Sequence, residues 1–156
     1  MKYIFIMVLL LSSLFGKYIV NDNYERALVL EVTGTENQQK EAFNLYLKSA
    51  EEGYAKGQFT IGVYYREGKE AGIEQDYVEA VKWYKLSARQ GYAPAQHNLG
   101  FRYLNGQGIK KNYIATYYWW SKAAKQGYVQ VQNSLSKFCE NESWACNDKI
   151  QYNDKD

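Results

Sequence analysis

Apolar and small side chains recur every three or four positions along several stretches of the chain, which is the spacing of one face of an α-helix. In the clearest stretch these residues are Ala80, Tyr84, Ser87 and Ala88. Gly91 follows that stretch and Pro94 begins the next, as expected for two helices joined by a tight turn. The pattern therefore predicts a helical hairpin.

The hairpin pattern is repeated. The segments 42–53, 80–91 and 116–127 align with one another, and each ends in a glycine followed by a tyrosine. These glycines are 38 and then 36 residues apart, and a second helical stretch follows each one. One pair alone leaves an apolar face uncovered, so pairs repeated at such a period stack on one another. We predict an all-α fold, an α-solenoid of antiparallel helix pairs, with helix A before and helix B after each glycine.

Helix B of the second unit contains a glycine where a helix former would be expected. Leu99 and Tyr103 repeat at a helical spacing on either side of Gly100. A glycine in a helix interior costs about 1 kcal/mol relative to alanine, so its presence needs a structural reason. We expect a helix A to approach closely at Gly100. Asp76 and Asn112 stand where N-caps of helix A are expected.

The first residues have the features of an export signal. The segment 1–16 has a charged start at Lys2, an apolar middle and a small residue at its end. We expect cleavage after Ser13 or Gly16; retention of the segment as a membrane anchor is the alternative, and membrane contact is expected only in that case. The prediction is an exported protein, periplasmic or secreted. In the following segment, 17–38, we expect a helix over residues 24–33 that caps the array.

The two cysteines fit an oxidising compartment. Cys139 and Cys146 are the only thiols of the chain, and six residues separate them. We expect them to form a disulfide in a C-terminal tail, 139–156, with two free thiols as the alternative. Zinc would require two more ligands nearby, and His97 is the only histidine. His97 aligns with Phe59 and is interpreted as a packing or surface position on helix B. We predict no metal site and no cofactor.

Charge and composition narrow the class of partner. The chain has 19 Lys and Arg against 17 Asp and Glu, a net charge of +2, which gives no strong field for nucleic acid or an anionic membrane. Aromatic residues make up 17% of the sequence, far more than in disordered chains, so a packed core is expected. We predict a protein or peptide partner and no nucleic acid; the oligomeric state is left open.

The repeat resembles the Sel-one-like repeat (SLR) family, relatives of the tetratricopeptide repeat. The second unit carries the residue types of the family at their usual spacings: Ala80-Val81-Lys82-Trp83-Tyr84, Ser87-Ala88, Gly91, Ala93, Ala95-Gln96, Leu99-Gly100, Tyr103, Gly106 and Gly108-Ile109. The resemblance covers three repeats over residues 39–138. The third departs from the pattern, with Thr116 for alanine, Ser136 for glycine and Cys139 for tyrosine. The resemblance implies a scaffold that binds proteins or peptides.

A catalytic alternative rests on one short motif and on the family. Ser134 and Lys137 fit the pattern S-x-x-K, in which a lysine activates a serine nucleophile. No Lys-Thr-Gly or Ser-Asp-Asn motif accompanies it, and Ser134 aligns with Thr60 and Asn98 as an ordinary repeat position. We therefore assign no catalytic residue. The resemblance keeps an alternative open, because some cysteine-rich secreted members have been linked to β-lactamase or penicillin-binding activity.

Four consecutive aromatic residues mark the third helix A. Successive helical side chains are about 100° apart, so the rings from Tyr117 to Trp120 cannot all share one buried face. The counterparts of Tyr118 are Asn44 and Lys82, which makes it the residue that faces outwards. We predict that Tyr118 anchors a partner on the surface formed by successive A helices.

Lysines surround the predicted anchor. Lys82, Lys85 and Lys122, with Lys125 beyond them, are expected to flank Tyr118 and to favour a partner with carboxylates. Two alternatives stay open. Tyr118 packs on the C-terminal segment around Trp144, or the lysines serve only to keep helix A soluble.

Overall fold

The computed structural model describes residues 21–68, 70–149 and 152–153. Within them the chain forms helices and no strand, which confirms the all-α prediction. The helices are α2 (Asp22–Thr33), α3 (Glu36–Glu51), α4 (Ala55–Glu67), the short 3-10 helix η1 (Glu70–Gly72), α5 (Tyr77–Arg89), α6 (Ala93–Asn105), α7 (Tyr113–Lys125) and α8 (Val129–Asn141). The expected signal, 1–16, lies outside the described residues.

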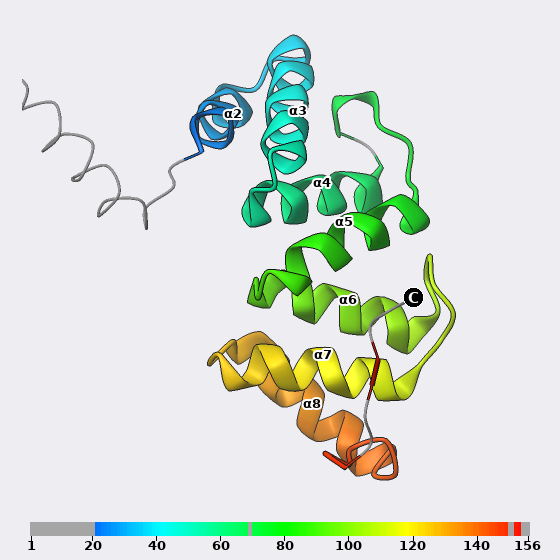
Figure 1. Ribbon diagram of the computed structural model, residues 1–156. Helices are drawn as coiled ribbons and strands as arrows, with labels where there is room; N and C mark the ends of the chain where they lie inside the picture. Colours follow the sequence, from blue (N-terminus) through cyan, green and yellow to red (C-terminus); the bar gives the residue numbers. More distant parts are fainter. Residues whose placement is uncertain (1–20, 69, 150–151, 154–156) are drawn as a thin grey trace, which may run out of the picture.

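The helices stack in chain order into a solenoid (Figure 1). Helix A of the three units is α3, α5 and α7, and helix B is α4, α6 and α8. Each of α4 and α6 packs more extensively on the helix A that follows than on the helix A of its own unit. The hydrophobic core accordingly runs along the stack as three successive clusters. The array is one continuous stack and not a row of separate hairpins.

The helix α2 covers the first unit. It lies where a capping helix was expected, and it packs against α3. Its Glu31 carboxylate accepts hydrogen bonds from the hydroxyls of Tyr46, at 2.7 Å, and Tyr64, at 3.3 Å. Asn21, the N-cap of α2, donates from its side chain to the Glu52 carboxylate at 2.9 Å. Polar contacts at both ends thus fix α2 on the first unit.

Equivalent positions of the repeat have the same local structure. The turn glycines Gly53, Gly91 and Gly127 have φ of 90°, 90° and 79°, a left-handed conformation that favours glycine. Asp76 and Asn112 cap α5 and α7, as predicted, with side chains that accept backbone N–H bonds. The register of 38 and 36 residues therefore relates equivalent sites in three dimensions.

Two glycines inside helix B, Gly62 and Gly100, are contact points between units. A Cβ built on Gly62 would lie 2.6 Å from the ring of Tyr84, and one on Gly100 would lie 2.4 Å from the ring of Trp120. Both rings belong to the helix A of the following unit. The close approach predicted at Gly100 is thus observed, and the helix that approaches is α7.

Glutamines connect the same junctions. Gln58 is buried and donates to the Ala50 carbonyl, while Gln90 of the next unit donates to the Gln58 side-chain oxygen at 2.7 Å. At the next junction the Gln126 side chain donates in the same way to the Gln96 side-chain oxygen at 2.8 Å. Because a buried amide without partners is costly, each link requires the adjoining unit to be in place.

Candidate functional site

After α8 the chain turns back across α7 (Figure 1). A disulfide joins Cys139, near the end of α8, to Cys146, with an S–S distance of 1.98 Å. Both described cysteines are thereby paired, as expected for the oxidised chain. Beyond the disulfide, residues 152–153 lie in front of α7 (Figure 1), where Tyr152 contacts Tyr118 of α7 and Tyr103 of α6. The first three residues of the predicted tail, 139–141, belong to α8, so from here on the tail means residues 142–149 and 152–153.

Tyr118, the predicted anchor, lies under the tail. Its ring is half-buried and contacts the ring of Tyr152, with centroids 4.9 Å apart. On its other side it packs edge-on against Trp119 at 5.0 Å, and the Lys122 ammonium lies 4.5 Å from its ring centroid. The residue that covers Tyr118 is Tyr152. The alternative that Tyr118 packs on the C-terminal segment thus describes its surroundings, but Trp144 itself is 56% exposed and contacts Tyr113.

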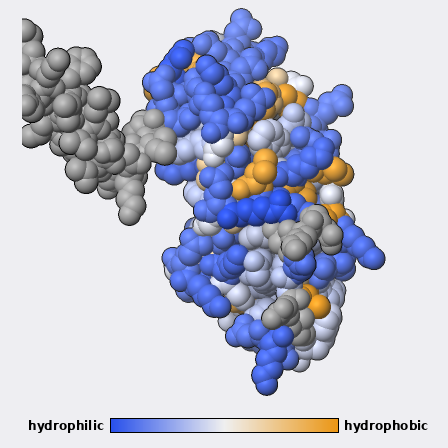
Figure 2. All heavy atoms as spheres, viewed as in Figure 1, coloured by the Kyte–Doolittle hydropathy of each residue, from blue (hydrophilic) through white to orange (hydrophobic). Residues whose placement is uncertain are grey.

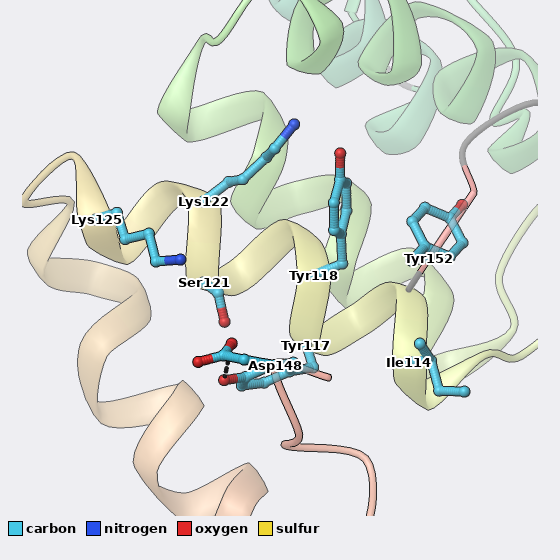
Figure 3. A pocket seen from close by; sticks show the side chains of 8 residues that line it. All are labelled: Ile114, Tyr117, Tyr118, Ser121, Lys122, Lys125, Asp148 and Tyr152. Carbon is cyan, nitrogen blue, oxygen red and sulfur yellow. Dashed lines mark hydrogen bonds between the residues drawn. The ribbon is translucent and has the colours of Figure 1, made fainter. Parts of the chain in front are cut away.

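A cavity of about 370 Å³ opens beside Tyr118 (Figure 3). Helix α7 and the tail line it, with the side chains of Ile114, Tyr117, Tyr118, Ser121, Lys122, Lys125, Asp148 and Tyr152. The Tyr117 hydroxyl donates to the Asp148 carboxylate at 2.9 Å. Burial, reinforced by the hydrogen bond to Asp148, raises the pKa of Tyr117, so the phenol remains a donor at neutral pH. The walls are aromatic and the rim carries cations.

A second cavity, of about 260 Å³, lies on the other side of Tyr152. It is lined by Lys85, Tyr103, Ile109, Lys110, Lys111, Asn112 and Tyr152. The Tyr152 and Tyr103 hydroxyls share a hydrogen bond of 2.8 Å. Since Tyr152 belongs to both linings, it separates two cationic spaces on the same side of the stack.

The face of the molecule in Figure 2 is mainly hydrophilic, and its apolar atoms form small separate groups.

The predicted lysines do not all share one site. Lys122 and Lys125 line the first cavity and Lys85 lines the second. Lys82 is paired with Glu79, Nζ to Oε2 at 2.6 Å, and lines neither cavity. That hydrogen bond raises the pKa of Lys82. Tyr118, Lys122 and, across Tyr152, Lys85 thus form one surface, and Lys82 stands outside it.

Ser134 and Lys137, of the S-x-x-K motif, line a third cavity of about 360 Å³ between α7, α8 and the end of α6. Apolar side chains such as Leu104 and Trp120 dominate the rest of its wall. In the described part of the chain no hydrogen bond links the Ser134 hydroxyl to the Lys137 amine. The two residues share a pocket without the contact that would activate the serine.

His97 packs against aromatic rings. Its ring stacks on Trp120 with centroids 6.0 Å apart and lies 5.7 Å from Tyr128. Burial lowers the pKa of His97, because it penalises the charged imidazolium.

Across residues 21–68, 70–149 and 152–153, no three metal-ligating side chains gather into a group. Over the same residues, no helix has the length and apolar character needed to cross a bilayer.

Several residues of this surface are absent from the sequence-based prediction of the site, among them Tyr103, Asp148 and Tyr152. Tyr103 is identified there only as a repeat position, and Asp148 and Tyr152 lie in a tail with no periodic pattern. One signal was present: Tyr152 is an isolated aromatic residue in a polar segment, where a solvated tail would not require it.

Comparison with known proteins agrees with the stack and its register. The model of the Sel1 repeat family matches residues 33–54, 55–92 and 93–128. The chain is similar to a Sel1 repeat protein from Oxalobacter formigenes, with 38% identity and a TM-score of 0.61 over 65% of this chain and 39% of that one. It is also similar to a protective antigen of uropathogenic Escherichia coli with an SLR fold, at 22% identity and a TM-score of 0.61 over 86% of this chain and 33% of the other. No curated protein sequence gives a match.

The protein defined by these features is an α-helical repeat protein, and it belongs to the Sel1 repeat family. The second and third matched segments each run from the start of a helix B through the helix A that follows, which is the pair with the most extensive packing. Proteins built from this repeat generally serve as scaffolds for contacts between proteins. The chain spans less than half the length of either solved structure.

Proposed function

We propose that this chain is an exported scaffold that holds a protein or peptide partner in the cell envelope, on the surface formed by α5, α7 and the loop before α7. The observation that carries the proposal is the pair of cavities beside Tyr152, with Tyr118 and Lys122 on one side and Lys85 on the other. Helices leave no free backbone edge for a partner strand, so binding rests on side chains.

The chemistry of the surface favours a particular kind of partner. Rigid aromatic side chains such as Tyr118 supply contact area at a small entropic cost, which is why binding surfaces favour them. Lys122 and Lys125 on one side of Tyr152, and Lys85 on the other, add positive charge. A segment with aromatic and carboxylate side chains complements both features.

Export is supported by two features of the chain. The segment 1–16 has the pattern of a secretory signal. The pairing of Cys139 with Cys146 suits an oxidising compartment. Cell fractionation, with amino-terminal sequencing of the mature chain, tests this part of the proposal; recovery of full-length protein in the cytosol contradicts it.

The binding proposal is tested by cross-linking and pull-down from the envelope of the producing cell. Tyr118→Ala should reduce recovery of the partner at least about tenfold, the size expected for loss of a hot-spot residue. Trp144→Ala is the matched control, because it removes an exposed aromatic side chain that lines neither cavity beside Tyr152. Equal recovery with Tyr118→Ala and the unchanged chain contradicts the role of Tyr118, and absence of any selective partner contradicts the scaffold.

A second candidate function rests on Ser134 and Lys137, which line the same cavity. It is β-lactam hydrolysis or penicillin binding, with Ser134 as the nucleophile. Nitrocefin turnover by the purified chain, abolished by Ser134→Ala, would establish it. Absence of turnover, together with absence of a covalent penicillin adduct by mass spectrometry, removes this candidate.

A further inference from the structure

The tail occupies the binding surface in the manner of a ligand. Tyr152 inserts a ring beside Tyr118, with centroids 4.9 Å apart, and beside Tyr103, with centroids 6.1 Å apart. Its hydroxyl meets the Tyr103 hydroxyl at 2.8 Å. We call this place, between Tyr103 and Tyr118, the tyrosine slot. Two rings and one hydroxyl partner specify an aromatic side chain with a polar end.

A carboxylate provides a second point of attachment. Asp148 stands four positions before Tyr152 and accepts the hydrogen bond from Tyr117 at 2.9 Å. Tyr117 and Tyr118 are neighbours on α7, so adjacent side chains hold the two ends of one short segment (Figure 3). The pattern recognised is therefore an acidic residue followed four positions later by a tyrosine.

The tail fills only part of the available space. Tyr152 is half-buried and Asp148 is exposed. Unfilled volumes of about 370 and 260 Å³ remain on the two sides of Tyr152. Lys122 and Lys125 border the first space, and Lys110 and Lys111 border the second. A longer segment with further carboxylates therefore finds contacts in this groove that the tail does not make.

We propose that the tyrosine slot recognises a partner segment with a carboxylate four positions before a tyrosine, and that Asp148 and Tyr152 of the tail compete for the same contacts. This inference rests on the proposed function and specifies its partner. Because the tail is tethered, its effective concentration at the slot is on the order of millimolar, so a partner must exceed its affinity or make the additional lysine contacts to displace it.

The test measures binding of a fluorescein-labelled peptide with the sequence of residues 148–154, by fluorescence anisotropy, to the full chain. Tyr152→Ala should bind the peptide about tenfold or more tightly than the unchanged chain, because the competitor is gone. Asp148→Ala removes the oxygen that accepts from Tyr117, which asparagine would keep, and should tighten binding in the same direction. The double variant Tyr118→Ala with Tyr152→Ala should lose the gain. Circular dichroism verifies that each variant is folded.

Several outcomes overturn the inference. Equal affinity of the unchanged chain, Tyr152→Ala and Asp148→Ala shows that the tail does not compete. Equal binding of a peptide with alanine in place of tyrosine shows attraction by charge alone. A dimer of the unchanged chain in light scattering that Tyr152→Ala dissociates assigns the slot to the tail of a second copy.

The failure of this inference and the failure of the proposed function are separate results. If pull-down recovers a partner that depends on Tyr118 and the peptide does not bind, the scaffold stands and the tyrosine pattern is wrong. If the peptide binds Tyr152→Ala tightly and no partner is recovered from the envelope, the slot stands and the cellular role is wrong.

Discussion

The junction between α6 and α7 and the region around α8 contain equivalent residues in different surroundings. At the junction Gly100 is buried under the ring of Trp120. Its counterpart on α8 is Ser136, which is exposed. Likewise Gln96 is buried and accepts a hydrogen bond from Gln126, whereas its counterpart Gln132 is exposed. A repeat position thus takes its role from the unit that follows.

The difference explains the departures of the third unit from the repeat pattern. No further helix follows α8 in the described part of the chain, so Ser136 meets no incoming ring. Cys139 replaces the tyrosine found at 65 and 103, and it joins the tail through the disulfide. Packing between units holds the junction together. The tail is held by the disulfide and by side-chain contacts of Trp144, Asp148 and Tyr152.

The largest contrast is expected between two tryptophans. Trp120, at the junction, is 3% exposed and donates to the His97 carbonyl at 2.9 Å, while Trp144, in the tail, is 56% exposed. Trp120→Ala should lower the free energy of unfolding by about 3–5 kcal/mol. Trp144→Ala should change it by no more than about 0.5 kcal/mol. Urea unfolding followed by circular dichroism measures both, and equal losses would remove the distinction between the regions.

The glycine contrast is smaller. Gly100→Ala should cost about 1–2 kcal/mol of unfolding free energy, because overpacking against Trp120 outweighs a gain of about 1 kcal/mol in helix propensity. Ser136→Ala, on the open surface of α8, should be neutral or slightly stabilising. The same unfolding experiment serves, and a Gly100→Ala variant more stable than the unchanged chain would show that no close packing exists there.

The glutamine link should contribute less again. Gln126→Ala leaves the buried Gln96 side chain without the donor at 2.8 Å, and should cost about 1 kcal/mol. Gln132→Ala, the exposed counterpart on α8, should stay within about 0.5 kcal/mol of the unchanged chain. Urea unfolding of Gln126→Ala and Gln132→Ala measures both effects. Identical unfolding free energies would mean that the link between Gln96 and Gln126 does not contribute to stability.

The smallest effect concerns pH. Burial lowers the pKa of His97 below its ordinary 6.5, so the folded chain binds fewer protons there than the unfolded chain. The stability that depends on a neutral His97 is fully present above the pKa of the unfolded chain. It is lost as the pH falls towards the lower pKa of the folded chain. His97→Phe, which copies the counterpart Phe59, should therefore lose less stability between pH 7.5 and 5.5, values chosen to lie about one unit either side of 6.5.

A reverse substitution checks the assignment. Phe59 packs on Tyr84 and Tyr92 as His97 packs on Trp120 and Tyr128. Phe59→His should gain the pH dependence that His97→Phe loses. Unfolding curves at both pH values test the pair, and parallel pH profiles for both variants would place the titrating group elsewhere.

The repeat could be predicted from the sequence because its contacts recur. Gly100 indicated a close neighbour, and the structure shows the same kind of contact at its counterpart Gly62. The local spacing of Cys139 and Cys146 likewise pointed to their pairing. Each of these features is either repeated along the chain or formed by residues close together in the sequence, so the spacing of residues is enough to indicate it.

The tyrosine slot could not be predicted in full. Tyr118 was identified by comparison with Asn44 and Lys82, which is an argument about its own helix. Its neighbour Tyr152 comes from a tail that occurs once and has no counterpart in another unit. A single contact between distant segments leaves no period in the sequence, so only the fold reveals it.

The helices α4 and α6 each pack more extensively on the helix A that follows than on the one that precedes. This difference bears on how such arrays grow by duplication. A duplication that copies α6 together with α7 carries a whole junction, with Gly100 already matched to Trp120. A duplication that copies α5 with α6 instead places α6 against a second copy of α5, two surfaces that did not evolve to pack on each other. We therefore expect a segment cut at the tyrosine before a helix B, such as Tyr54 or Tyr92, to fold more readily in another array than a segment cut before a helix A.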